Sequence, residues 1–276
     1  MNLTIGCDPE LFLFDNLEQR IVPAVGKIGG SKQKPLKLSK GTVQLDGTAI
    51  EIGTHPASSG EEFADNIQSV ISEVTTKLDN RFHGRYSLRC GALAGYDERD
   101  IDPNHEAFDV GCEPHYSFDS GNRLVKVGGA DKLDMRQVPV GGHIHVGFGC
   151  DMSTTDRRLI VSVARFVDVL HRNFPVVTNV PSLLREDMMS GGQPVVRVKP
   201  YGFEYRNPDS YWLSSREATV KIYDLLVEVA ATLTSATDHR YYMLEARSEL
   251  LGEMHKIRNH TQRLPSKYQS TLPLDF

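Results

Sequence analysis

Charged and imidazole side chains occupy alternate positions within otherwise apolar stretches of this chain, and this feature restricts how it can fold. In GGHIHVG, His143 and His145 stand two residues apart among apolar residues and glycines. FEYR repeats the pattern with Glu204 and Arg206. Residues two apart share one face of a strand, so each pair is expected on one side of a sheet. Burying such groups costs free energy unless they pair with one another or bind a metal ion.

Two acidic stretches near the start of the chain have the same character. In GCDPELFLF, Asp8 and Glu10 share a strand face. In QLDGTAIEI, Asp46 and Glu51 have opposite parity, and we expect a bulge at Gly47 to bring them to one side. Both stretches therefore add carboxylates to the faces of apolar strands.

Each of these motifs has an ordinary structural explanation when it is taken alone. HxH is typical of a hydrogen-bonded pair on a strand, ExR of a cross-strand ion pair, and DPE and DG of turns. Their joint occurrence in apolar strands, with Glu113 in GCEP as a further carboxylate, favours a different interpretation. We expect one sheet face on which carboxylates and an imidazole converge on hard divalent cations, with arginines for a phosphate.

The hydrophobic pattern predicts an α+β fold with a mostly antiparallel, curved β-sheet and helices packed on one side. Short alternating or apolar runs predict strands, and they lie next to one another in the sequence rather than alternating with helices. Helical spacing of apolar residues predicts helices at 60–79 and 154–173, the first with a capping box formed by Ser59 and Glu62. Further helices are expected from near Ser214 onward and over 241–257, followed by an irregular tail at 263–276.

Composition excludes several classes of function. The chain is 39% hydrophobic and 24% charged with a net charge of −5, so we expect no nucleic-acid partner. No apolar run is long enough for a membrane helix, and the start lacks the features of a signal peptide. The four cysteines are widely spaced without a CxxC pair, which indicates free thiols. We therefore expect a cytoplasmic protein, folded as a single domain over 1–276 with a sheet-rich core at about 3–230 and a helical region at 214–260.

One lysine-rich stretch, KIGGSKQKPLKLSKG, has the composition of a loop. It is interpreted either as a solvated loop or as a mobile loop that contacts phosphate. In the second interpretation Lys32 is the candidate for binding a nucleotide.

The order of the motifs resembles that of the glutamine synthetases. GCDPELFLFD resembles their early acidic strand, GGHIHVG their histidine strand, and YGFEYRNPDSYWLSSREATVKIYDLL their late ExR strand with the helix after it. GGSKQKPLKLSKGTVQLDGTAIEI and VVRVKPYGFEYRNPDSYWL are more similar still to the phage-encoded carboxylate–amine (COOH–NH2) ligases of the glutamine synthetase and γ-glutamylcysteine synthetase superfamily. The resemblance spans about residues 3–230 and implies a fold like the catalytic domain of glutamine synthetase.

The resemblance also implies roles for individual residues. Two arginines, Arg206 and Arg197, match positions that contact the transferring phosphate or the substrate, and His145 matches one near the nucleotide phosphates. Glu51 is implied both as a catalytic residue and as a metal ligand. The implied metal ligands are Glu10, Glu51, Glu113, His143 and Glu204.

The implied activity is an ATP- and Mg²⁺-dependent ligation, with Mn²⁺ as a substitute, that forms an amide or peptide bond through an acyl phosphate. Its partners would be small-molecule or peptide carboxylates and amines, and the resemblance further implies a viral origin, location in the host cytoplasm and compatibility with a homo-oligomer. Two other hypotheses remain open at this point. One is a metal-dependent amide hydrolase using the same carboxylates and histidines, and the other is a non-catalytic binding protein.

Overall fold

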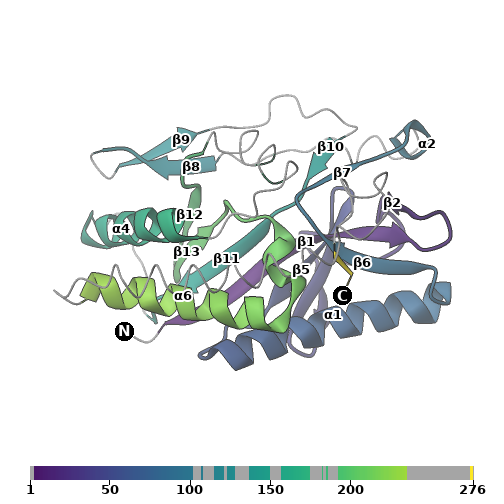
Figure 1. Ribbon diagram of the computed structural model, residues 1–276, viewed down its shortest axis with the longest axis horizontal. Coiled ribbons are helices and arrows are strands. Elements are labelled where there is room, and N and C mark those ends of the chain that lie inside the picture. Colours follow the sequence, from purple (N-terminus) through teal and green to yellow (C-terminus); the bar gives the residue numbers. More distant parts are fainter. Residues whose placement is uncertain are drawn as a thin grey trace.

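A long first strand, β1 (Thr4–Asp15), lies at the centre of the sheet (Figure 1). The computed structural model describes residues 3–101, 107, 115–120, 123–127, 137–149, 157–174, 182, 185, 192–234 and 274–275. The first part of β1 pairs with β5 (Ala49–Thr54) and β11 (Gly142–Gly147), and its last residues pair with β2 (Arg20–Val22) and β6 (Tyr86–Cys90). One strand therefore connects the two halves of the sheet.

The main path of the sheet runs β3-β4-β5-β1-β11-β13-β12-β8-β9, and β2, β6 and β14 join it from the side. The strands not yet placed are β3 (Leu36–Leu38), β4 (Gly41–Asp46), β8 (His115–Phe118), β9 (Leu124–Val127), β12 (Val196–Lys199), β13 (Gly202–Tyr205) and β14 (Leu274–Asp275). Every strand pairing within the described part of the chain is antiparallel. The expectation of a mostly antiparallel sheet is confirmed, and the sheet is open, because its path ends at β3 and β9.

In the described part of the chain, three long helices and two short ones accompany the strands. They are α1 (Gly60–Phe82), α2 (Glu98–Ile101), α4 (Arg157–Asn173), the 3₁₀ helix η2 (Ser210–Ser214) and α6 (Arg216–Thr234). A separate two-stranded sheet is formed by β7 (Leu93–Gly95) and β10 (Gln137–Pro139). Among the described residues, no helix has both the length and the apolar character needed to cross a bilayer.

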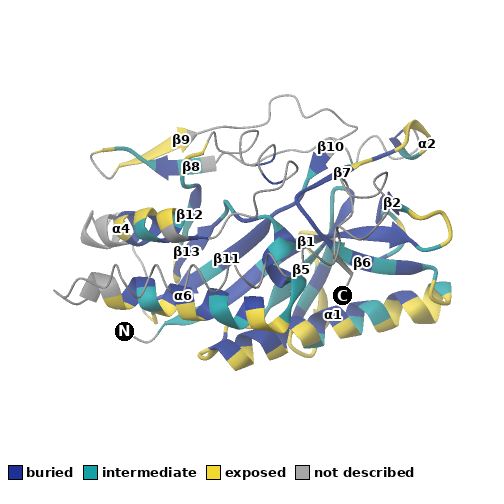
Figure 2. Ribbon diagram, viewed as in Figure 1, coloured by how far each residue is buried: buried dark blue, intermediate teal, exposed yellow. Residues whose placement is uncertain are grey.

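The apolar face of the sheet packs against α1, α4 and α6 (Figure 2). In β11, Ile144 between the two histidines and Val146 after them are fully buried in this core. The helices supply matching apolar stripes, which in α1 include Phe63, Ile67 and Val70. The expected helix stripes at 60–79 and 154–173 are thus confirmed where side chains are described.

The opposite face of β1 changes character along its length. Gly6, Asp8 and Glu10 lie at its start, whereas Phe12 and Phe14 follow at the same parity and belong to a second apolar cluster. That cluster also contains residues of α2, β7 and β10. The second apolar cluster covers the end of this face that carries Phe12 and Phe14 and does not include the polar half of the strand.

Local capping explains where the helices begin. Ser59 accepts a hydrogen bond from the Glu62 amide at 3.2 Å, and Glu62 in turn accepts one from the amide of Ser58 at 2.8 Å. For α6 the predicted start near Ser214 is one residue early. Ser215 accepts the hydrogen bond from Ala218 N at 3.1 Å, because Ser214 is the last residue of the preceding 3₁₀ helix.

Three other expectations need correction. The expected bulge at Gly47 is a two-residue hairpin turn in which Asp46 pairs with Ala49 and Gly47 has a φ of 55°. The lysine-rich stretch is not loop throughout, because β3 lies within it and pairs with β4. The tail is not wholly irregular, because β14 pairs with β6. The predicted helix at 241–257 lies outside the described residues, as do Cys112 and Cys150. Cys7 and Cys90 are thiols outside any disulfide in the described structure, as expected, and both are buried.

The Asp15 carboxylate provides a test of how β1 is anchored at its end. Asp15 is 1% exposed, and it accepts hydrogen bonds from the Arg85 guanidinium at 2.9 and 2.7 Å and from the amide of Leu17 at 3.0 Å. Burial raises the pKa of Asp15, but the hydrogen bonds from Arg85 and the backbone outweigh it and hold the pKa below its ordinary value. The carboxylate therefore stabilises the fold at pH values above its unfolded pKa of about 3.9, and this contribution is lost as the pH falls through the folded pKa.

We expect Asp15→Asn to lower the free energy of unfolding by about 1–3 kcal/mol at neutral pH, because Arg85 loses a charged acceptor. In urea unfolding, the difference from the unmodified chain should close as the pH falls below about 4. Asp168→Asn is the matched control, since Asp168 forms an exposed ion pair with Arg172 on α4, and it should change stability by less than about 0.5 kcal/mol. A difference that does not depend on pH would contradict this account.

Candidate functional site

The strand registers bring the polar residues of β1, β11, β13 and β12 onto one face of the sheet. Asp8 lies opposite His143 in the pairing of β1 with β11. His145 lies opposite Glu204, and Glu204 lies opposite Arg197. Directly opposed residues share a face, so four neighbouring strands contribute to one polar surface.

The same surface continues to the other side of β1. Glu10 lies opposite Glu51 of β5, and Glu51 lies opposite Gln44 of β4. The tight turn at Gly47 places Asp46 on this face as well, since Asp46 opposes Ala49 and Ala49 is two residues from Glu51. The segment thus forms a hairpin turn and also contributes to the acidic surface.

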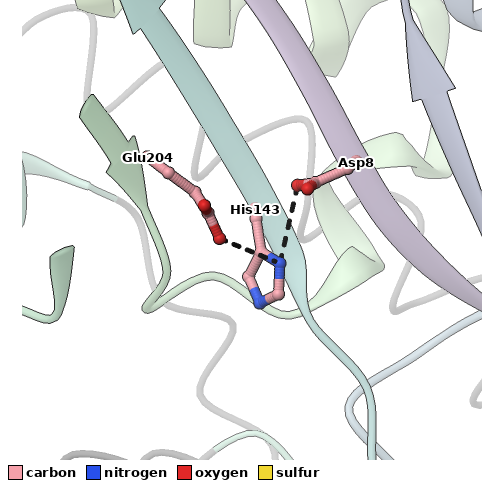
Figure 3. A group of neighbouring side chains, drawn as sticks. All are labelled: Asp8, His143 and Glu204. Atoms are coloured by element: carbon pink, nitrogen blue, oxygen red, sulfur yellow. Dashed lines mark ion pairs between the residues drawn. The ribbon is translucent and has the colours of Figure 1, made fainter. Parts of the chain in front are cut away.

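Asp8, His143 and Glu204 form the closest group of potential metal ligands among the described residues (Figure 3). The Nδ1 atom of His143 lies 3.5 Å from Asp8 Oδ1 and 3.8 Å from Glu204 Oε1. One potential ligand atom from each residue lies within 4.8 Å of the others. His143 points between the two carboxylates, which come from the strands on either side of it.

Glu204 is completely buried and has basic side chains around it. Its carboxylate contacts Lys199 Nζ at 3.0 Å and Arg197 at 3.4 Å, and it accepts a hydrogen bond from Arg206. Burial raises the pKa of Glu204, but the nearby His143 and Arg206 outweigh this and lower the pKa to about 2. Glu204 is therefore ionised at neutral pH and holds the basic side chains in place.

Asp8 and His145 have buried polar atoms whose hydrogen-bonding capacity is not satisfied. Asp8 Oδ1 and His145 Nε2 lie 2.9 Å apart, but the contact lacks hydrogen-bond angles and neither atom has a hydrogen-bond partner in the described structure. The other ring nitrogen of His145, Nδ1, is hydrogen-bonded to the hydroxyl group of Tyr201. Burial raises the pKa of Asp8, yet the two histidines lower it well below the usual range. An ionised, incompletely paired carboxylate thus lies at the centre of the surface.

Carboxylates crowd the side of the surface formed by β5 and β4. Burial raises the pKa of Glu51 to about 9, and the neighbouring charges of Asp8, Glu10 and Asp46 add to the increase. Burial likewise raises the pKa of Glu10, whose side chain accepts a hydrogen bond from the Gly141 amide at 2.7 Å. This crowding is unfavourable without a positive charge, and a cation would relieve it.

The donor set fits a hard divalent cation such as Mg²⁺. Carboxylate oxygens predominate, and one imidazole joins them, which is the ligand chemistry that Mg²⁺ and Mn²⁺ accept. Asp8 Oδ1 has no hydrogen-bond partner in the described structure, and the high pKa of Glu51 reflects crowding by the neighbouring carboxylates as well as burial. Asp8, His143 and Glu204 are the residues placed to hold the ion, with Glu10 and Glu51 on adjoining strands.

The structure brings most of the candidate residues of the sequence onto this surface. Glu10, Glu51, His143 and Glu204 share the face, although Glu10 and Glu51 lie outside the closest ligand group. The guanidinium groups of Arg197 and Arg206 meet at Glu204 as a pair of candidate phosphate-binding groups.

Lys32 and Glu113 are the two remaining candidates from the sequence. Lys32 lies at the far edge of the surface, with its Nζ 3.9 Å from Asp46 Oδ2 and its side chain 58% exposed. Glu113 lies outside the described residues.

Sequence reasoning missed three residues of this surface. Asp8 was recognised as sharing a face with Glu10 but was not included among the metal ligands. Lys199 was not singled out, although it stands two residues from Arg197 and so shares its strand face. Tyr201 has no such signal, because it belongs to the turn between β12 and β13 and meets His145 only in the folded chain.

Comparison with known proteins identifies the family. A sequence-family model described as "Phage phiEco32-like COOH.NH2 ligase-type 2" matches residues 123–270, which is more than half of the chain. The chain belongs to this family, whose description is that of carboxylate–amine ligases in general. The matched segment includes His143, Glu204 and both candidate arginines, whereas Asp8, Glu10 and Glu51 precede it. No curated protein sequence matches the chain.

The raised pKa of Glu51 predicts how the metal-free protein responds to pH. A carboxyl group whose pKa is higher in the folded than in the unfolded chain favours folding most at low pH. Its contribution declines as the pH rises from the unfolded pKa of about 4.3 toward about 9. In the presence of a chelator, the melting temperature should therefore fall between pH 5 and pH 9, within the range that these two values define.

Glu51→Gln should make the melting temperature fall less as the pH rises, because the uncharged amide does not repel its acidic neighbours. Adding Mg²⁺ or Mn²⁺ at alkaline pH should raise the melting temperature of the unmodified chain more than that of Glu51→Gln. Glu217→Gln changes an exposed glutamate on α6 and is the control expected to behave like the unmodified chain. Equal pH dependence and equal metal response in all three proteins would refute the acidic cluster as a cation site.

Proposed function

We propose that this protein is an ATP- and Mg²⁺-dependent ligase that joins a carboxylate to an amine through an acyl phosphate, on a sheet like that of the glutamine synthetase catalytic domain. The observation that supports it best is the surroundings of Glu204. One buried carboxylate contacts two arginines and a lysine and lies beside the group of Asp8 and His143. Basic groups for phosphate thus lie directly next to ligands for a divalent cation.

The proposed reaction explains why both kinds of group are needed. An amine does not displace hydroxide from a carboxylate at a useful rate, because hydroxide is a poor leaving group. Transfer of the γ-phosphoryl group from ATP converts that oxygen into phosphate, which leaves readily when the amine attacks. The transfer brings a carboxylate and a polyphosphate together, so their negative charges must be neutralised.

The basic residues around Glu204 are suited to the phosphoryl group. Guanidinium groups bind phosphate oxygens through paired hydrogen bonds, and Arg206 retains a buried Nε atom without a hydrogen-bond partner in the described structure. Glu204 fixes the guanidinium of Arg206 before any substrate binds, so little orientation has to be gained during the reaction. Arg197 and Lys199, which are about one quarter exposed, present further positive charge beside it.

Asp8, His143 and Glu204 would hold the metal ion, with Glu10 and Glu51 available on neighbouring strands. A bound divalent cation supplies charge neutralisation and alignment of phosphate oxygens. At the opposite edge, near Asp46 of β4, Lys32 would add a contact to the nucleotide phosphates.

Phosphate release from ATP tests the activity. We expect release only when a carboxylate and an amine are both present, with a product of the combined mass less one water. A screen of carboxylate and amine pairs with product detection by mass spectrometry makes the measurement. Amide hydrolysis without nucleotide would instead establish the hydrolase alternative, and no turnover of either kind would support a binding protein.

Arg206→Ala should lower kcat by about 100- to 1000-fold, because it removes a preorganised donor to the transferring phosphoryl group. Arg216→Ala is the matched control, since Arg216 forms ion pairs with Glu61 and Asp65 on the surface and should retain activity. Circular dichroism must show that both variants are folded. Full activity of a folded Arg206→Ala variant at saturating substrates would rule out the assigned role.

A further inference from the structure

A cavity of about 430 Å³ opens beside the polar surface, where the first residues of β1 meet the ends of β5 and β11. Asp8 and His145 line it and also belong to the polar surface, so the two spaces adjoin. The remaining wall includes His55, Pro56 and Tyr201. Apart from Asp8, His145 and Tyr201, its described lining residues have no role in the site described so far.

Threonines opposite glycines form the floor of the cavity. Thr42 opposes Gly53, and Thr4 opposes Gly147. A Cβ atom at Gly53 would lie 2.7 Å from the hydroxyl oxygen of Thr42, so that position accommodates only glycine beside the threonine. Thr4 and Thr42 both line the cavity and bring hydroxyl groups to it. Glycines and hydroxyl-bearing threonines therefore line this part of the cavity.

The charge of the wall differs from that of the neighbouring phosphate-suited region. Asp8 is the only Asp, Glu, Lys or Arg among the described residues that line the cavity. The basic side chains of Arg197, Lys199 and Arg206 gather instead around Glu204, on β12, β13 and the residue after β13. Lys32 lies with Asp46 beyond β5. An anion in the cavity would lie beside the Asp8 carboxylate, with no lysine or arginine among the described lining residues to bind it.

We propose that this cavity binds the amine substrate, with its ammonium group beside Asp8 and its carbon skeleton over the glycine and threonine floor. The ligand class is a primary amine with a small, largely apolar or hydroxyl-bearing body. This inference rests on the proposed ligase function, because it assigns the second substrate of the same site. It divides the surface into a basic side for phosphate and carboxylate and a negatively charged cavity for the amine.

Gly6 permits a direct test of the cavity. It lines the floor, and a Cβ atom added there would meet its nearest neighbours, Thr54 and Pro56, at 3.5–3.8 Å, which is ordinary contact. Gly6→Ala therefore narrows the cavity without forcing the backbone to move. Gly29→Ala is the matched control, because its added methyl group meets only the flexible side chain of Leu36 at 3.1 Å and Gly29 does not line the cavity.

Binding of n-butylammonium chloride, sodium butyrate and adenosine is measured by saturation-transfer NMR in the full chain without ATP or metal. We expect the amine to bind, to bind about tenfold more weakly to Gly6→Ala, and to bind unchanged to Gly29→Ala. Asp8→Asn should also weaken binding of the amine, because the ammonium group loses its counter-charge.

The inference would be overturned if the amine did not bind, or if it bound equally to Gly6→Ala and to the control. It would also be overturned if Gly6→Ala selectively lost binding of butyrate or of adenosine. The binding assay does not depend on catalysis. Amine binding that responds to Gly6→Ala but without any ligation would support the cavity and reject the proposed function. Ligation without amine binding in this cavity would support the proposed function and reject the cavity as the amine site.

Discussion

The buried carboxylate of Glu204 is the constraint on which the rest of the site depends. A fully buried charge is costly, and here Arg197 and Lys199 on the neighbouring strand and Arg206 just after the end of β13 offset it. Those contacts exist only in one register of β12 against β13, because a slip by one residue would move every side chain to the other face. In the same register Phe203 and Tyr205 point into the helix-covered core. Electrostatics and packing therefore select the same arrangement.

The position of β1 explains how a charged site and a stable core share one sheet. Its polar half faces His143 and Glu51, whereas its continuation at Phe12 and Phe14 lies in the second apolar cluster. The ligand-bearing residues lie on strands that are paired on both sides, which limits their freedom to move. A site of this kind can hold unfavourable crowding, such as that around Glu51, because the surrounding core prevents the strands from separating.

Much of this arrangement could be predicted because strand and helix periodicity act locally. The alternation in GGHIHVG placed His143 and His145 together and Ile144 opposite them, and the stripe containing Phe63 and Ile67 identified α1. Contacts that depend on turns were harder to predict. The turn at Gly47 was expected to be a bulge, since parity alone does not distinguish it from a two-residue hairpin. The cap at Ser215 was displaced by one residue because a 3₁₀ helix precedes α6.

The sequence by itself determined which residues are apolar, which strands carry charge on one face, and which chemistry those charges suit, because these properties depend on residue type and spacing along a single strand. Only the tertiary structure decided that Asp8, rather than Glu10, meets His143 and Glu204, and that Tyr201 contacts His145. It also decided that a cavity with one negative residue adjoins a basic region. These features arise between strands far apart in the chain, where register and turn geometry set the distances, and no local pattern specifies them.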